Sequence, residues 1–379
     1  MLIATVPEFS FTAHLLPGLA CLYGSGVLAS FIFAGRHSVS PGFRALLHWL
    51  PIAVSVIVSL FFGWDHIAVS LIFGSAICLL TCAVGSLGLV APIGPAPEHR
   101  KAVWRILPAT ALIIFVIGFK GIFRPMHGVI MLLEGLAVLS LWREPVIEKW
   151  QTPESLSQGA APNNLLRCVL LVVVILVAAF GAMQSGIGTQ DMTHSNFPIN
   201  EGLIASFVWS LVLVNPIMLS GRKPAHVGAS WLPMTAQVGV VLLNLCVLIP
   251  LVCATPYLRH WSRHPEVIGN SMGLKTTLAK KFNTGGSTIP VPSTTTARST
   301  AIEPRFTSSN SEELTLFPDT SEMIAFPLPV WRIDCVLMLL VSLMLLPVAV
   351  GKWNLSRVES GCLLAGYAVY LFAGIIFGA

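Results

Sequence analysis

Long runs of apolar residues, separated by short polar connections, dominate the chain. Since about 20 apolar residues cross a bilayer as one helix, each long run is typical of a membrane span. The pattern predicts ten such helices: Phe11–Ala34, Phe43–Gly63, His66–Ala91, Val103–Phe119, Met126–Leu141, Leu165–Met183, Ile199–Leu219, Val227–Cys253, Val330–Val350 and Leu355–Phe377. We therefore expect an all-α, polytopic membrane protein.

Composition agrees with this interpretation. Hydrophobic residues make up 55% of the 379 positions and charged residues only 10%, with a mean hydropathy of +0.79. These fractions lie outside the usual range of soluble domains. The net charge of +5 does not indicate a nucleic-acid partner, because much of the Lys and Arg stands singly in short connections, where membrane topology accounts for it. The expected partner is the lipid bilayer.

Two polar stretches divide the chain. Residues 143–164 form a mixed-charge linker between a first five-helix half, residues 1–142, and a second half, residues 165–379. Within the second half, residues 255–328 are rich in Ser, Thr, Pro and Gly, so most of this loop is predicted to be disordered. A tolerated insertion is favoured over a regulatory or partner-binding loop.

The basic residues in the short connections predict an orientation. One side of the predicted membrane carries twelve Lys and Arg in its short connections, and the other side carries only Lys120 and Arg124. By the positive-inside rule the first side is cytoplasmic. Both termini, and the 255–328 loop, are then non-cytoplasmic, and we expect the cell (inner) membrane.

The chain contains a faint internal repeat. Pro51–Ala76 is echoed by Pro216–Val241: in both copies a Pro-Ile pair is followed, 23 residues after the proline, by a glycine, Gly74 or Gly239. An Arg-x-x-x-Gly spacing also recurs near the end of each half, at RPMHG and RVESG. Five helices per half would give the two copies opposite orientations in the bilayer, so the repeats are expected to be inverted.

These residues resemble a signature of the cation/calcium antiporter superfamily, which includes the sodium/calcium exchangers. In that family each half carries a Pro-Glu pair on its second helix and a Gly-Asn-x-x-Gly-Ser-Asn-x-x-Asn run on its third. Here Pro51, Gly74 and Ser75 match the first copy, and Pro216 and Gly239 match the second. Asn244 stands at the last asparagine of the second run. The resemblance implies two inverted five-helix repeats and a transport function.

The departures from the signature concern the cation ligands. Ile52 and Ile217 occupy the two acidic positions that hold the cation in the family. The first two asparagines of the runs are also replaced, by Leu71 and Ala76 in one copy and by Ala236 and Val241 in the other. Because Ca²⁺ takes six to eight oxygen ligands, we expect no metal site here.

Polar groups within apolar runs are the remaining candidates for an ion or solute pathway. They are Ser55, His66, Ser70, Ser75, Glu134, Asn215, Ser220, Gln237 and Asn244. Glu134, well inside a span, is interpreted equally well as a proton carrier, a substrate ligand or a carboxyl satisfied by a neighbouring helix. Helix capping is the favoured interpretation of His66 with Asp65. The amides and hydroxyls are interpreted either as the lining of a neutral or weakly cationic pocket or, slightly favoured, as interhelical hydrogen bonds. Asp334, two residues after Arg332, is expected at a membrane face.

Two functions follow as hypotheses. The first is a diverged secondary transporter of a cation or small solute that lacks the paired acidic calcium ligands. The second is a transport-inactive relative that serves as a structural or regulatory subunit with a membrane-protein partner. No enzyme motif or cofactor motif is present in the sequence, and Cys78 and Cys82 are expected to be buried small hydrophobes.

Overall fold

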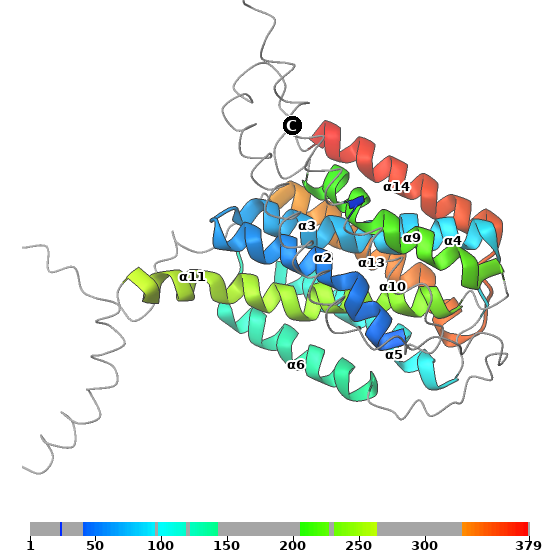
Figure 1. Ribbon diagram of the computed structural model, residues 1–379, viewed down its shortest axis with the longest axis horizontal. Helices are drawn as coiled ribbons and strands as arrows, with labels where there is room; N and C mark the ends of the chain where they lie inside the picture. Colours follow the sequence, from blue (N-terminus) through cyan, green and yellow to red (C-terminus); the bar gives the residue numbers. More distant parts are fainter. Residues whose placement is uncertain are drawn as a thin grey trace, which may run out of the picture. The chain divides into compact units, whose positions relative to one another are not determined.

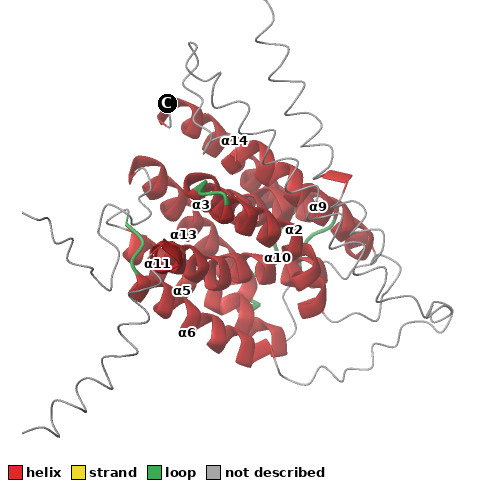
Figure 2. Cartoon of the chain, turned by 60° about the vertical axis from the view of Figure 1, so that its left-hand side comes forward, coloured by secondary structure: helices red, strands yellow, loops and turns green. Residues whose placement is uncertain are grey.

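The computed structural model describes residues 23–24, 41–94, 98–118, 122–142, 205–226, 231–263 and 328–377. Every named element in these ranges is a helix (Figure 2), which confirms the predicted helical class for the described part of the chain. The predicted first and sixth helices lie outside the described residues, except for Tyr23 and Gly24, and so does the 143–164 linker.

The elements of the first half are α2 (Pro41–Phe61), α3 (Asp65–Cys78), η1 (Leu79–Ala83), α4 (Val84–Val90), α5 (Glu98–Gly118) and α6 (Pro125–Trp142). Those of the second half are η4 (Ala205–Trp209), α9 (Ser210–His226), α10 (Trp231–Leu243), η5 (Asn244–Leu248), α11 (Ile249–Arg263), α13 (Leu328–Val350) and α14 (Arg357–Phe377). The three η elements are π-helical turns, and each continues directly into an α-helix.

Eight predicted spans therefore have counterparts in the described structure. Their bounds differ little from the predicted ones where both ends are described: the predicted His66–Ala91, for example, is the continuous helix from Asp65 to Val90. The main difference is α11, which extends to Arg263. The first residues of the predicted 255–328 loop are therefore helical. Pro256 lies inside α11 and does not end the helix.

Three helices of the described residues are long and apolar enough to cross a membrane: Asp65–Val90, Pro233–Ser262 and Ile333–Val350. Shorter apolar helical stretches are His48–Phe61, Trp104–Gly118, Pro125–Ser140 and Ser206–Leu219. The helix of α3, η1 and α4 lies in the centre of the bundle, and every residue from Ile67 to Cys78 is buried. A helix that is apolar on all sides is expected at such a position.

A π-turn interrupts the third helix of one half and the corresponding helix of the other at equivalent positions. η1 begins at Leu79, 28 residues after Pro51, and η5 begins at Asn244, 28 residues after Pro216. Because π-turns are rare and are mostly single bulges within α-helices, their coincidence with the sequence repeat supports a common origin of the two copies.

Helix packing between the two halves is reciprocal (Figure 1). α2 of the first half packs against α10 and η5 of the second, while α9 of the second half packs against α3 and η1 of the first. α5 of the first half and α13 of the second half also pack extensively against each other. Each half therefore completes the core of the other.

The chain forms two compact units, Met1–Ala254 with Ile324–Ala379, and Thr255–Met323. The first contains the helical bundle. The described residues of the second are Thr255–Arg263, the end of α11, where the rings of Tyr257 and Trp261 meet edge to face with centroids 6.4 Å apart. All candidate residues discussed below lie in the first unit.

Candidate functional site

The proline of the first signature lies inside α2, where it leaves no backbone N–H for the helical ladder. Ser55 donates a hydrogen bond to the Pro51 carbonyl at 2.9 Å, and Ser59 donates one to the Ser55 carbonyl at 2.9 Å. Both hydroxyls are buried, so their bonds within α2 satisfy them without a ligand. Ser55, a predicted pathway residue, is therefore satisfied within its own helix.

The two positions that are acidic in the resembled family are enclosed by apolar packing. Ile52 is 0% exposed on α2, and Ile217 is 4% exposed on α9. The replaced asparagine positions, Leu71, Ala76, Ala236 and Val241, are buried as well. These six side chains supply no oxygen ligand, and an unliganded divalent cation would bear a large desolvation penalty among them.

The signatures of the two halves meet at one hydrogen bond. The Asn244 Nδ2 donates to Ser75 Oγ at 2.9 Å, and Ser75 Oγ donates to the Ile72 carbonyl at 3.2 Å. Both side chains are 0% exposed. Ser75 follows Gly74, the glycine of the first signature, on α3, and Asn244 is the last residue of the second signature and the first residue of η5. The bond therefore joins the signature of the first half to that of the second.

Two buried amides on this helix retain unused hydrogen-bonding capacity. Among the described residues, the Oδ1 of Asn244 has no hydrogen-bond partner, and neither the Oε1 nor the Nε2 of Gln237 has one, although Gln237 is only 1% exposed. Gln237 lies seven residues before Asn244, about 10 Å along the helix, a spacing that places residues on the same helical face. We call Ser75, Gln237 and Asn244 the repeat crossing, in which Asn244 and Ser75 are joined by the hydrogen bond.

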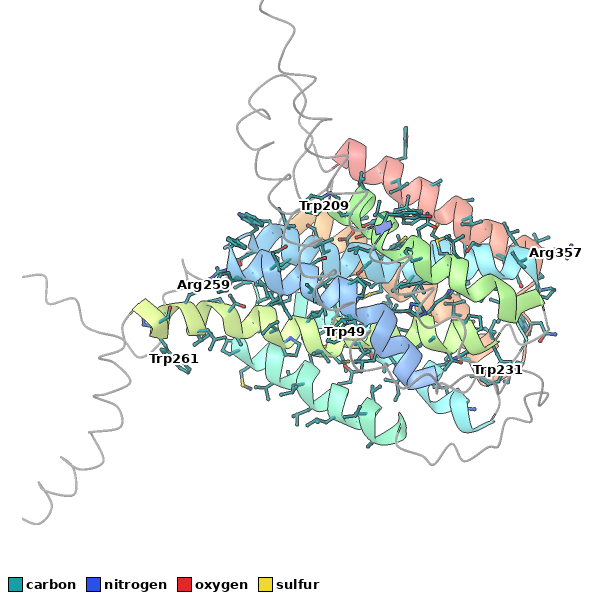
Figure 3. The ribbon with its side chains drawn as sticks, in the orientation of Figure 1. Trp49, Trp209, Trp231, Arg259, Trp261 and Arg357 are labelled. Carbon is teal, nitrogen blue, oxygen red and sulfur yellow. The ribbon has the colours of Figure 1, made fainter. Side chains whose placement is uncertain are left out.

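Gly74 allows a close approach between the halves. A Cβ built on Gly74 would overlap the Ser206 carbonyl oxygen and would lie 2.6 Å from the Ser206 Cα. Only glycine leaves room for the backbone of η4 at this point. Trp209, the last residue of η4 and labelled in Figure 3, is 3% exposed. Gly239, the matching glycine of the second half, is buried in α10.

Glu134 on α6 has one satisfied oxygen and one free oxygen. Thr110 of α5 donates a hydrogen bond to Glu134 Oε1 at 2.6 Å, whereas Oε2 is buried without a partner. The next residue, Gly135, packs on η5: a Cβ there would lie 2.9 Å from the Cβ of Cys246. Glu134 thus lies where α6 meets the π-turn that begins at Asn244.

The remaining candidates do not gather at the repeat crossing. His66 is exposed in the first turn of α3, in keeping with a place at the end of a span. Ser70 is buried on α3 and Asn215 is half-buried on α9. Ser220 lies on α9, and its side chain is outside the described part of the structure.

Asp334 of α13 is buried inside the bundle. It is 1% exposed, and Tyr370 of α14 donates a hydrogen bond to its Oδ1 at 2.8 Å. The reason for the burial is that α14 covers this side of α13 and brings an aromatic hydroxyl to the carboxylate. Asp334 is the second residue of the apolar stretch Ile333–Val350, and its expected place near a membrane face, which concerns depth in the bilayer, stays a prediction.

The described residues include no group of three His, Cys, Asp or Glu side chains that could hold a metal ion. Cys78 and Cys82 are free thiols, both buried, as expected for small hydrophobes. The chemistry available at the repeat crossing is therefore neutral hydrogen bonding, from one hydroxyl and two amides.

Comparisons with known proteins agree with this architecture. Residues 43–143 match the family model described as sodium/calcium exchanger protein. The sodium-calcium exchanger NCX_Mj, soaked with 10 mM Na⁺ and 10 mM Sr²⁺, aligns with a TM-score of 0.56 at 15% identity, covering 96% of this chain and 98% of that one. The H⁺/Ca²⁺ exchanger CAX aligns with a TM-score of 0.60 at 13% identity, covering 97% and 88%. A comparison with curated proteins gave no significant match.

The chain therefore has the fold of these two exchangers, and the structural matches extend over nearly its whole length. The sequence match to the family model covers most of the first half, from α2 to α6, in agreement with the resemblance drawn from the signature residues.

Proposed function

We propose that this protein is a diverged secondary transporter that moves a small cation or small solute without paired acidic calcium ligands. The observation that carries the proposal is the repeat crossing, where three amide atoms of Gln237 and Asn244 are buried without partners. A buried polar group left unsatisfied costs about 1–3 kcal/mol. An apolar side chain would avoid this cost, so the amides favour a polar ligand or water.

The neutral character of the crossing limits the cargo. Hydroxyl and amide oxygens can replace part of the hydration shell of a monovalent cation or form hydrogen bonds with a polar solute. A divalent cation requires carboxylate ligands, and the two positions that would supply them are occupied by the buried side chains of Ile52 and Ile217. Substrate sites near the interface of two repeats are typical of secondary transporters. The fold of NCX_Mj and CAX, both of them exchangers by description, supports the transport class.

The transporter would consist of ten helices in two inverted five-helix repeats. The reciprocal packing of α2 on α10 and of α9 on α3 is the pattern that a two-fold axis between the halves would produce. The excess of Lys and Arg in alternate short connections supports cytoplasmic placement of that side, with both termini outside. The protein would be a multi-pass protein of the cell (inner) membrane.

A second function is favoured by a different observation. The former ligand positions are filled by apolar side chains that are almost completely buried, and such a core suits a transport-inactive subunit that stabilises a membrane-protein partner. This alternative gives no role to the unpartnered amides of Gln237 and Asn244.

Flux measurements on purified protein in liposomes distinguish the transporter from the transport-inactive subunit. Vesicles would be given sodium, calcium or proton gradients, and uptake would be compared between the natural protein and a Gln237→Leu variant. The transporter hypothesis predicts sodium or proton movement that the variant loses. Ser59→Ala, which removes a hydroxyl bonded within α2, is the matched control and should transport normally. No flux under any gradient, together with stoichiometric recovery of a membrane-protein partner, would refute the transporter.

A further inference from the structure

A second buried polar cluster lies outside the repeat crossing. Its members are Asp334 on α13, Tyr370 on α14 and Ser206 on η4, which we call the Asp334 cluster. The Tyr370 hydroxyl donates to Asp334 Oδ1 at 2.8 Å and lies 3.2 Å from Ser206 Oγ, also within hydrogen-bonding distance. The three side chains are all buried, and Asp334 is only 1% exposed. The second carboxylate oxygen, Oδ2, has no partner.

Aromatic rings surround the polar atoms of this cluster. The ring of Phe207 meets that of Tyr370 edge to face, with centroids 5.1 Å apart, and the Tyr367 ring lies 6.0 Å from that of Tyr370. Phe207 also rests on α14 at Gly374, where a Cβ would overlap its ring. The polar atoms of the cluster are therefore enclosed by η4 and α14.

No described cation is paired with Asp334. The titratable groups nearest to it are the Tyr370 hydroxyl and the thiol of Cys335, its neighbour on α13. From α3 and η1, which also pack on α13, Cys78 and Cys82 lie beside Tyr367. The described charged or basic side chains of α3 and α5 are Asp65, His66 and Arg105, of which the last two are exposed.

An ionised carboxylate at this place would carry a buried charge that only one hydrogen bond stabilises. The cost of burying such a charge far exceeds that of the neutral acid, so a buried carboxyl without a cation takes up a proton. A metal cation would need several oxygen ligands around it, and within the cluster only Oδ2 is free. Ionisable residues inside membrane proteins are typically parts of ion or proton pathways.

We propose that Asp334 is a proton-binding site. A hydronium ion transfers one proton to Oδ2: its own O–H bond breaks, an O–H bond forms at Oδ2, and a water molecule and a neutral carboxylic acid result, while Tyr370 holds the group through Oδ1. Release is the reverse step: the O–H bond breaks and the proton passes to water when the cluster opens.

The site deepens the proposed function by naming the proton as the coupling ion, and that part rests on the proposed function. The structural link is η4, because Ser206 contacts Tyr370 with its side chain and Gly74 of the first signature with its backbone. A displacement of η4 during transport therefore alters the cluster and the signature helix together.

Infrared difference spectroscopy of the purified protein tests proton binding directly. In the difference between protein at neutral and at alkaline pH, the carbonyl band of a protonated carboxyl should appear as a lost band, and Asp334→Asn should lack that band. Tyr370→Phe should shift the band, because the hydrogen bond to Oδ1 is lost. Glu134→Gln, which changes another acid of the described helices, should leave the Asp334 band in place.

Two results would overturn the proposal: a carboxyl band unchanged in Asp334→Asn, or a band that disappears on adding sodium at constant pH, which would make the site a sodium site. Flux assays provide the second arm. Asp334→Asn should abolish movement driven by a proton gradient while sodium counterflow persists. If the natural protein shows no flux but the infrared band is present, the transport function is refuted, whereas proton binding at Asp334 is supported.

Discussion

The close contact at Gly74 gives the sharpest test of how the two halves fit together. A methyl group on this residue would lie 2.6 Å from the Ser206 Cα and 2.7 Å from the Ser206 Oγ. Carbon atoms in contact normally lie about 3.5–4.0 Å apart, so Gly74→Ala would force the backbones of α3 and η4 apart by about 1 Å. The obstacle includes backbone atoms, which cannot rotate away as a flexible side chain can.

The expected cost follows from the same geometry. Overpacking of a well-filled core destabilises by about 1–3 kcal/mol, and the upper part of this range applies where the backbone must move. Gly366→Ala on α14 is the matched control, because a Cβ there meets nothing within 4 Å. That change should be neutral or slightly stabilising, since alanine favours a helix over glycine by up to about 1 kcal/mol in water.

The assay is thermal unfolding of both variants in the same detergent, with the surviving monodisperse fraction measured by size-exclusion chromatography. Gly74→Ala should unfold at a lower temperature than the natural protein, and Gly366→Ala should not. Equal melting temperatures for the two variants would show that α3 and η4 do not meet as closely as described, and the reasoning on the junction of the halves would be refuted.

Three further predictions concern the other interhelical contacts. A double-mutant cycle of Ser75→Ala and Asn244→Ala should give a coupling of about 1 kcal/mol in unfolding measurements, and a coupling of zero would mean that the bond between the signatures is absent. Thr110→Val should destabilise the protein by about 1 kcal/mol in the natural background but not when Glu134 is changed to Leu; an equal loss in both backgrounds would argue against the bond between them. Gly135→Leu should reduce the yield of folded protein by separating α6 from η5, and unchanged yield and melting temperature would contradict that contact.

Much of the fold could be predicted from the sequence because membrane helices are long apolar runs that end at polar turns. The run from His66 to Ala91 and the helix from Asp65 to Val90 illustrate this. The π-turns at Leu79 and Asn244 could not be predicted, since both lie in apolar runs that have no polar face whose periodicity an extra residue would shift.

The site was predicted less completely than the fold. Ser75, Gln237 and Asn244 were identified because polar side chains in apolar runs are conspicuous, but sequence alone does not show which of them meet. The burial of Asp334 could not be predicted because it depends on the helix that covers it, and the partner residue Tyr370 lies 36 positions further along the chain. Partners so distant in sequence follow from tertiary packing, which the apolar pattern does not encode.

Calcium uptake by reconstituted protein is the most direct test of the central proposal, that this protein lacks the acidic ligands that a divalent cation requires. Liposomes containing the protein would be loaded with sodium or acid and exposed to radiolabelled calcium. With isoleucine at both former acidic positions, uptake should equal that of protein-free liposomes under either gradient. Saturable calcium uptake that depends on the protein and on the imposed gradient would contradict the account.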